Sequence, residues 1–206
     1  MKYSKVFFSA VAAGVVISIG GAVFLSLDNK IAGALFFSVG LFTICTFGFH
    51  LFTGKLCYLF DNDRAYALSL PVIWLGNLCG CLLSSGLLQL TRSGAGFMAA
   101  AQKVCAPKLN DTLLSLFILG VFCNILIYIA VNGFKEIPHE IGKYLALFLG
   151  VTVFILAGFE HCVADMFYFT AAGVWSADTA VRLLVITAGN FAGGLILPLL
   201  GRYLRH

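Results

Sequence analysis

Four ionisable side chains lie inside long apolar stretches of the sequence, where a charge is costly. They are His50, Glu160, His161 and Asp165. A charged side chain at the centre of a bilayer costs at least about 2.5–3.5 kcal/mol on insertion scales, so such residues usually face a pathway or one another. An imidazole titrates near neutral pH and can therefore exchange a proton with a passing weak acid. The adjacent pair Glu160-His161 predicts such chemistry; the structural alternative is a buried ring that bonds a backbone carbonyl.

Two further charged residues could act with this pair. Asp165 stands one helical turn after His161, where it could fix the imidazole ring or cap a helix. Lys108 follows Pro107 and precedes an apolar run. An ammonium at a pore mouth would attract an anion, although a lysine at a membrane interface is common without any such role.

Other chemistries find little support in the sequence. The four histidines are scattered, and the seven cysteines form no C-x-x-C pair and are odd in number. We therefore expect no metal site and no disulfide framework. No phosphate-binding loop and no Ser-His-Asp or Cys-His constellation is present. We expect no cofactor and no enzymatic activity.

The composition indicates which surroundings hold these residues. Of the 206 residues, 61% are hydrophobic and only 11% are charged, and the mean hydropathy is +1.00. Soluble domains carry about 25% charged residues. The composition excludes a soluble globule and a disordered chain. The net charge of +4 is small and dispersed, which argues against a nucleic-acid partner. The partner predicted for most of the surface is the lipid bilayer.

Polar residues divide the chain into six apolar segments, which predict an all-α integral membrane protein with a single transmembrane domain over residues 1–206. The segments are 6–27, 31–60, 68–90, 112–134, 144–175 and one that follows 178–182 and ends at Arg202. The first is too long for a signal-peptide core of about 7–15 residues. The second and fifth exceed the roughly 20 residues that span a bilayer and contain polar interruptions. We expect these two helices to be broken.

The distribution of basic residues predicts the orientation of the chain. If the N-terminus is inside, eight Lys and Arg residues lie in inner segments and five in outer ones. The inner ones are Lys2, Lys5, Lys55, Arg64, Lys135, Lys143, Arg202 and Arg205; the outer ones are Lys30, Arg92, Lys103, Lys108 and Arg182. We expect a multi-pass protein of the inner (plasma) membrane with both termini in the cytoplasm.

The two halves of the chain resemble each other, over approximately residues 6–91 and 111–203. Gly48-Phe49-His50 is followed by Gly76-Asn77, and Gly158-Phe159-Glu160-His161 is followed by Gly189-Asn190. Three spans in each half place the halves in opposite orientations. Inverted repeats with a broken helix in each half mark a midplane pathway. Asn77 and Asn190 are expected to bond backbone freed at the breaks, with direct substrate contact as the alternative.

These motifs resemble the formate–nitrite transporter family of pentameric anion channels. The resemblance extends from about Ala10 to about Leu200, and its most specific parts are Leu51-Phe52-Thr53-Gly54 and Gly158-Phe159-Glu160-His161 followed by Val163-Ala164-Asp165-Met166. It implies six transmembrane helices in an aquaporin-like protomer, with one pore in each subunit of a homopentamer.

The resemblance also implies site residues. The central pair would be Thr53 and His161, and the vestibule lysine would be Lys108, 16 residues before Asn124. Constrictions would be formed by Phe37, Leu41 and Phe154 on one side of the pore and by Leu51, Phe52 and Ile127 on the other, with Phe159 as a further lining residue. Glu160, Asn124 and Asn190 complete the expected substrate pathway.

Three positions depart from the pattern of that family. His50 stands where an acidic residue is usual, and Asp165 stands where asparagine is usual. Only Lys2 or Lys5 could replace the usual lysine of the inner vestibule. These departures concern pH gating and substrate choice more than the fold.

The expected function is passage of the small monovalent anion of a weak acid, with protonation near His161. Formate, nitrite, hydrosulfide and short carboxylates all remain open as substrates. A channel for a neutral solute is the first alternative, although the two Asn-Pro-Ala motifs typical of aquaporins are absent. An ammonium channel using His50 and His161, and a membrane enzyme with Glu160 as acid or base, are the others.

Overall fold

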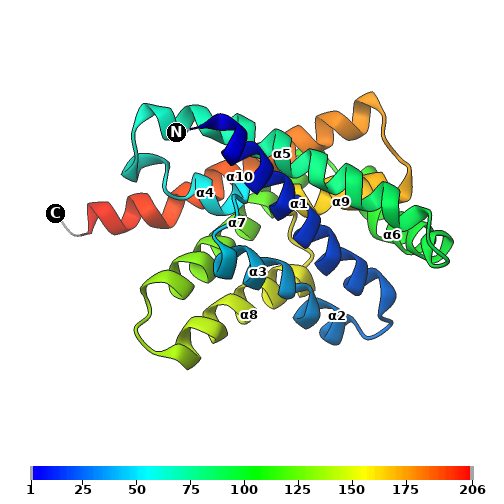
Figure 1. Ribbon diagram of the computed structural model, residues 1–206, viewed down its shortest axis with the longest axis horizontal. Coiled ribbons are helices and arrows are strands. Elements are labelled where there is room, and N and C mark those ends of the chain that lie inside the picture. Colours follow the sequence, from blue (N-terminus) through cyan, green and yellow to red (C-terminus); the bar gives the residue numbers. More distant parts are fainter. Residues whose placement is uncertain (1, 205–206) are drawn as a thin grey trace.

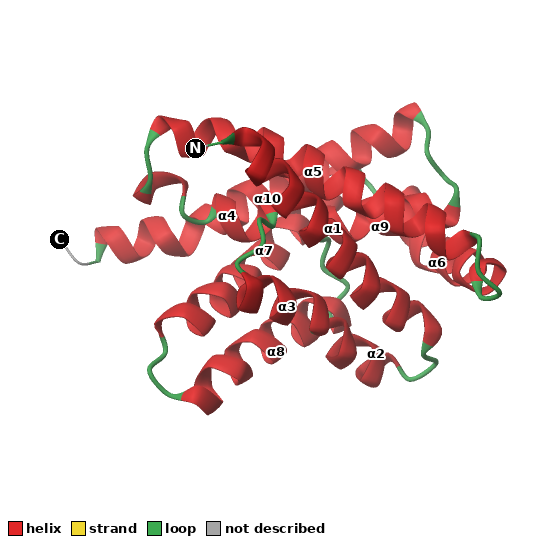
Figure 2. Ribbon diagram, in the orientation of Figure 1, coloured by secondary structure: helices red, strands yellow, loops and turns green. Residues whose placement is uncertain are grey.

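A computed structural model of the chain describes residues 2–204, and it contains helices and loops but no strand in that range (Figure 2). Arg205, counted above among the inner charges, lies outside the described residues. The helices are α1 (Tyr3–Ser26), α2 (Lys30–Phe37), α3 (Val39–Phe47), α4 (Phe52–Leu56), the short 3₁₀ helix η1 (Leu59–Asp61), α5 (Arg64–Gln89), α6 (Gly94–Asn110), α7 (Leu113–Glu136), α8 (Glu140–Leu156), α9 (Cys162–Ala172) and α10 (Ala177–Tyr203).

The predicted spans correspond closely to these helices. Within residues 2–204, five helical segments are long and apolar enough to cross a membrane: α1, α2 with α3, α5, α7 and α10. The predicted fifth span, residues 144–175, consists of two shorter helices, α8 of 17 residues and α9 of 11. The two overlong segments are thus broken, as expected.

The connection between the third and fourth spans contains a helix that we did not predict. Residues 94–110 form α6, a 17-residue helix, despite Gly94, Gly96 and the interior Pro107. Its flanking glycines and proline are residues that usually mark loops. In Figure 1, α6 lies beside α9 at the right of the molecule, and the two helices are in contact.

The two helix breaks have the same local construction. α3 ends at Gly48 and α8 is followed by Gly158, both with left-handed backbone at φ of 70° and 71°. Glycine adopts this conformation without steric penalty. Each glycine leads into an extended segment, after which α4 and α9 begin. The chain therefore exposes unpaired backbone groups at membrane depth at two places.

An asparagine from a neighbouring helix satisfies each break. Asn77 of α5 accepts a hydrogen bond from the N–H of Phe52 and donates to the carbonyls of His50 and Ala10. Asn190 of α10 accepts from the N–H of Cys162 and donates to the carbonyls of Glu160 and Gly120. Both asparagines are fully buried. Since lipid offers no hydrogen bonds, these contacts make the breaks tolerable inside a membrane.

The matching hydrogen bonds correct the alignment of the two halves. Asn77 binds the backbone of His50 in the same way as Asn190 binds that of Glu160. The counterpart of His50 is therefore Glu160 and not His161. Each break contains a histidine, but the alignment of Gly48-Phe49 with Gly158-Phe159 places His161 opposite Leu51.

Close helix pairs hold the broken helices in place. α1 packs along α5, and α7 packs along α10 (Figure 1). A Cβ atom at Gly120 would lie 2.9 Å from the carbonyl oxygen of Ile186, and one at Gly76 would lie 2.8 Å from that of Phe7. Small residues allow this approach where lipid supplies no hydrophobic drive for association.

The contacts of Asn190 generate a stability prediction. Asn190→Ala leaves the N–H of Cys162 and two carbonyls without their side-chain partner, and each unpaired buried group costs about 1–3 kcal/mol. We expect a lower thermal midpoint in detergent and loss of at least about 2 kcal/mol of stability. Asn110→Ala is the control, because exposed Asn110 bonds only Ala106 in its own helix. Equal midpoints for the two variants would contradict this role.

Candidate functional site

Two cavities enter the molecule and share no lining residue. The Lys108 cavity, of about 710 Å³, is lined among others by Phe24, Phe37, Lys108, Phe154, Phe159, Glu160, His161 and Asp165. The Lys55 cavity, of about 1330 Å³, is lined among others by Leu41, Leu51, Lys55, Tyr58, Lys135, Glu136 and Arg202. Asp111, before α7, lines the first cavity, and Glu136, at the end of α7, lines the second. The cavities therefore reach the site from opposite ends of α7.

The side chains between the two cavities form a barrier. At its centre is a hydrogen bond between the two halves of the chain. Thr53 Oγ1 of α4 lies 2.9 Å from Nε2 of His161, the residue that precedes α9. The ring of Phe154 stacks on the imidazole, with centroids 5.6 Å apart, and Phe37 meets Phe154 edge to face at 6.2 Å. All four side chains are buried. The barrier is thus apolar except for the Thr53–His161 pair.

The helix start fixes the protonation state of His161. His161 is the N-cap of α9, and its Nδ1 accepts a hydrogen bond of 3.1 Å from the backbone N–H of Ala164. A backbone N–H can only donate, so Nδ1 carries no proton. In the neutral ring the proton is therefore on Nε2, which donates to Thr53. His161 presents a fixed N–H donor between the cavities, and its other nitrogen is engaged.

Lys108 does not stand as a free cation at the cavity wall. Its Nζ contacts Glu160 Oε2 and lies 3.0 Å from Asp165 Oδ1. The three side chains are only 12%, 5% and 1% exposed. Burial by itself would lower the pKa of Lys108, but the Asp165 and Glu160 carboxylates outweigh it and hold this pKa above its ordinary value. The ammonium stays charged, and its charge is already matched within the protein.

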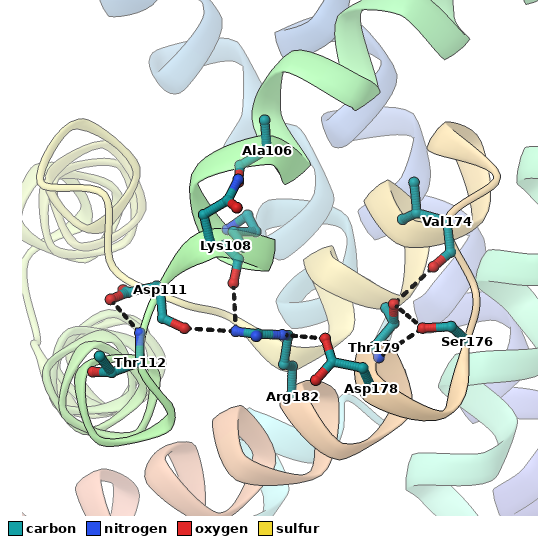
Figure 3. A network of polar contacts seen from close by, with 10 residues as sticks. Ala106, Lys108, Asp111, Thr112, Val174, Ser176, Asp178, Thr179 and Arg182 are labelled. Atoms are coloured by element: carbon teal, nitrogen blue, oxygen red, sulfur yellow. Dashed lines mark hydrogen bonds and ion pairs between the residues drawn. The ribbon is translucent and has the colours of Figure 1, made fainter.

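An arginine from α10 holds the end of α6 that carries Lys108. Figure 3 shows Arg182 between the backbone of Lys108 and Asp111 on one side and Asp178 on the other. Its guanidinium donates to the carbonyls of Lys108 at 3.1 Å and Asp111 at 2.7 Å, and to the Asp178 carboxylate at 2.6 Å. The position of Lys108 is therefore tied to the last helix as well as to the second break.

The structure brings most of the predicted site residues together, but not in the predicted grouping. Thr53, His161, Lys108 and Glu160 form a continuous set, and Phe37, Phe154 and Phe159 line the Lys108 cavity. Leu41 does not lie with Phe37 and Phe154: it lines the Lys55 cavity together with Leu51. Phe52 and Ile127 are buried and line neither cavity.

Two asparagines predicted for the substrate pathway are structural in this arrangement. Asn190 lines neither cavity, and its amide bonds three backbone groups. Asn124 lines neither cavity either, and its Nδ2 donates to the carbonyl of Thr53 at 3.1 Å. Asn124 therefore positions Thr53. Asp165 also differs from expectation, because it pairs with Lys108 instead of fixing the imidazole or capping α9.

Sequence reasoning missed Lys55 as a cavity residue. Lys2 and Lys5, the expected replacements for an inner lysine, are exposed and do not line the Lys55 cavity. Lys55 lines it from α4, and no ion pair of the described residues involves Lys55. Its position inside the apolar run 31–60, one turn from Leu51, was a signal that it lies at membrane depth.

The formal charges of the two cavities differ. Lys55, Lys135 and Arg202 line the Lys55 cavity against Asp61 and Glu136, an excess of one positive charge. The last four form two ion pairs, Lys135–Glu136 and Arg202–Asp61. Three lysines in the Lys108 cavity face four carboxyl groups, an excess of one negative charge if all are ionised: Lys30, Lys103 and Lys108 against Asp28, Asp111, Glu160 and Asp165.

Comparison with known proteins identifies relatives of this chain. The profile of the formate/nitrite transporter family matches residues 1–204. The formate channel FocB of Escherichia coli is 26% identical, over 94% of this chain and 84% of that protein. The nitrite transporter NirC of Escherichia coli is also 26% identical, over 94% of this chain and 80% of that protein.

Solved structures show the same fold. A pentameric formate channel with formate bound superposes with a TM-score of 0.83 at 26% identity, covering 98% of this chain and 97% of that chain. An ion channel of the same family superposes with a TM-score of 0.88 at 24% identity, covering 100% of this chain and 91% of that chain.

The all-helical membrane fold predicted from the sequence is thus confirmed. The family description names transport, in agreement with the expectation that the chain is not an enzyme. With the profile matched from residue 1 to residue 204, the chain is a multi-pass membrane protein that belongs to the formate/nitrite transporter family.

Proposed function

We propose that the chain forms a channel for small monovalent anions of weak acids, which cross its barrier as the neutral acid. Formate and nitrite are the substrates that the similar proteins are named for. One observation carries the proposal: the two cavities are separated by an apolar barrier whose polar centre is the Thr53–His161 hydrogen bond. Such a barrier suits a small solute that can lose its charge.

The physics of the barrier favours a neutral species. An unpaired ion transferred into an apolar medium faces a cost of tens of kcal/mol, and ionisable groups neutralise instead. A weak acid can do so by binding one proton while it loses water. The packed rings of Phe37, Phe154 and His161 make the barrier between the cavities apolar. Protonation of the anion near His161 therefore removes most of the cost of crossing, and the gradients of anion and proton can drive the flux.

His161 has a defined part in this scheme. Its Nε2–H is the donor that Thr53 accepts in the closed barrier, and the same N–H can bond an oxygen of the acid in transit. Its Nδ1 is engaged by the Ala164 N–H and cannot take up a proton without losing that bond. We therefore assign His161 the role of hydrogen-bond donor and Thr53 the role of its exchangeable partner.

The geometry of the two histidines argues against an ammonium channel. It requires His50 and His161 to face each other, but His50 Nδ1 bonds Ser9 Oγ at 2.6 Å, and both nitrogens of His161 have other partners. The apolar barrier and the unpaired Lys55 favour an acidic solute over a neutral one such as glycerol.

Assembly and orientation complete the proposal. The similar formate channel is pentameric, and we propose a homopentamer of this chain, with one pore in each subunit. Large exposed apolar residues such as Phe8, Phe36, Phe47 and Leu114 would then face lipid or neighbouring subunits. Both ends of the described chain lie toward the same side in Figure 1, and the excess of basic residues supports placing that side in the cytoplasm of a cell with an inner membrane.

Replacement of His161 tests the function. His161→Asn keeps an N-cap for α9 but removes the donor to Thr53 and the ring that stacks on Phe154. Loss of one strong hydrogen bond in transit, about 1.5–3 kcal/mol, predicts formate uptake into proteoliposomes reduced about tenfold or more. His139→Asn, at an exposed N-cap without a side-chain bond, should transport normally.

Two results would oppose the proposal. If the unaltered protein carries neither formate nor nitrite, the substrate class is wrong. If His161→Asn transports as well as His139→Asn, the barrier residue has no part in passage.

Removal of the unpaired lysine charge gives a second test. Lys55→Met takes away the one excess positive charge of the Lys55 cavity, and about 1 kcal/mol of lost attraction predicts a roughly fivefold higher half-saturating formate concentration from that side. The effect should shrink as salt concentration rises. Lys143→Met is the control, since Lys143 pairs with Glu140 outside both cavities. Identical formate dependence of the two variants would contradict the role of Lys55.

A further inference from the structure

We propose that Asp165 holds one exchangeable proton beside Lys108 and Glu160, and that Asp165 is the group from which an anion in the Lys108 cavity takes its proton. The donor role rests on the proposed function, whereas the location of the proton does not.

The surroundings of Asp165 suit a protonated carboxyl group better than an ionised one. Its side chain is 1% exposed, and neither carboxyl oxygen receives a hydrogen bond from any described residue. Lys108 Nζ approaches Oδ1 to 3.0 Å as an ion pair, without the direction of a hydrogen bond. An ionised carboxylate normally gathers several donors when it is buried. A carboxyl group that lacks them is better accommodated with a proton of its own.

The charges of Lys108, Glu160 and Asp165 balance only if one of the two carboxyl groups is protonated. The cluster holds one ammonium and two carboxyl groups, all nearly inaccessible to water. With both carboxyls ionised it carries one uncompensated negative charge, and the full cavity carries the same excess. Two carboxylates that share a site cannot both ionise easily. One proton, held by Asp165, makes the cluster neutral while Lys108 remains charged.

The surroundings supply no competing charge. The other titratable groups near Asp165 are thiols, a phenol and the engaged imidazole: Cys105 of α6, Cys123 of α7, Cys162 and Tyr168 of α9, and His161. Arg182 of α10 bonds the backbone of Lys108 and the Asp178 carboxylate. Of the groups that line the Lys108 cavity, only Glu160 and Asp165 are carboxyls with side chains buried against Lys108.

Both ring nitrogens of His161 are already engaged in hydrogen bonds. Because Nδ1 accepts from Ala164, loss of the Nε2 proton would leave an anionic ring. His161 can therefore hold the acid but is a poor source of its proton. Asp165 lines the same cavity as His161, so an anion that reaches the imidazole passes the carboxyl pair.

The transfer balances without any further reactant. The anion takes the proton of Asp165 and becomes the neutral acid, while the negative charge it brought stays on the Asp165 carboxylate beside Lys108. The total charge of the cavity does not change in this step. The neutral acid crosses the barrier, and Asp165 regains a proton from water in the open part of the cavity.

Infrared spectroscopy of the purified, unaltered protein tests the location of the proton. We expect a C=O stretch of a protonated carboxylic acid at neutral pH, which shifts when aspartate is labelled with a heavy carbon isotope. Asp165→Asn should abolish the band, and Glu140→Gln, which changes an exposed carboxylate paired with Lys143 outside both cavities, should keep it. Absence of the band in the unaltered protein, or its persistence in Asp165→Asn, would overturn the proposal whether or not formate is transported.

Uptake of labelled formate against pH tests the donor role. A variant without the donor depends on formic acid from bulk water, whose concentration falls about tenfold for each pH unit. Asp165→Asn uptake should therefore decline steeply with pH, while the unaltered protein and Glu140→Gln decline less. An Asp165→Asn profile equal to or flatter than that of the unaltered protein would overturn the donor role.

Discussion

The structure depends on one constraint: two stretches of irregular backbone must lie inside a membrane with every polar group satisfied. Asn77 and Asn190 meet this constraint, because each bonds the backbone of the break in its own half of the chain. The breaks in turn bring Thr53 and His161 to the same point. Without the asparagines, the freed N–H and C=O groups would favour continuous helices, and the two halves would have no polar meeting place.

The same constraint shapes the chemistry of the site. The N-terminal N–H groups of α9 need an acceptor, and His161 supplies it through Nδ1. The imidazole is thereby fixed as a donor toward Thr53, which suits contact with an oxygen atom in transit. The two cavities differ in charge: Lys55 is unpaired, whereas Lys108 is matched by Glu160 and Asp165. A lysine at a cavity wall therefore does not by itself make that cavity attractive to anions.

The sequence could predict the fold and the centre of the site because these depend on strong local signals. Apolar length defined the spans, and Gly-Phe with Gly-Asn marked the breaks. Pairing across the structure could not be read from spacing. The histidines at positions 50 and 161 suggested a matched pair, but the hydrogen bonds of the asparagines match His50 with Glu160. The helix α6, the neutralisation of Lys108 and the free Lys55 all arise from tertiary contacts between distant segments.

If a weak acid crosses the Thr53–His161 barrier without its charge, its passage carries no current, and electrical recording can measure this. The protein is placed in a planar bilayer with a formate gradient, and current is measured together with the pH change at the membrane surface. We expect each formate that moves to be accompanied by one proton, so that no net current flows. A steady formate current that reverses with the formate gradient would contradict it, because the anion would then pass the apolar barrier as an ion.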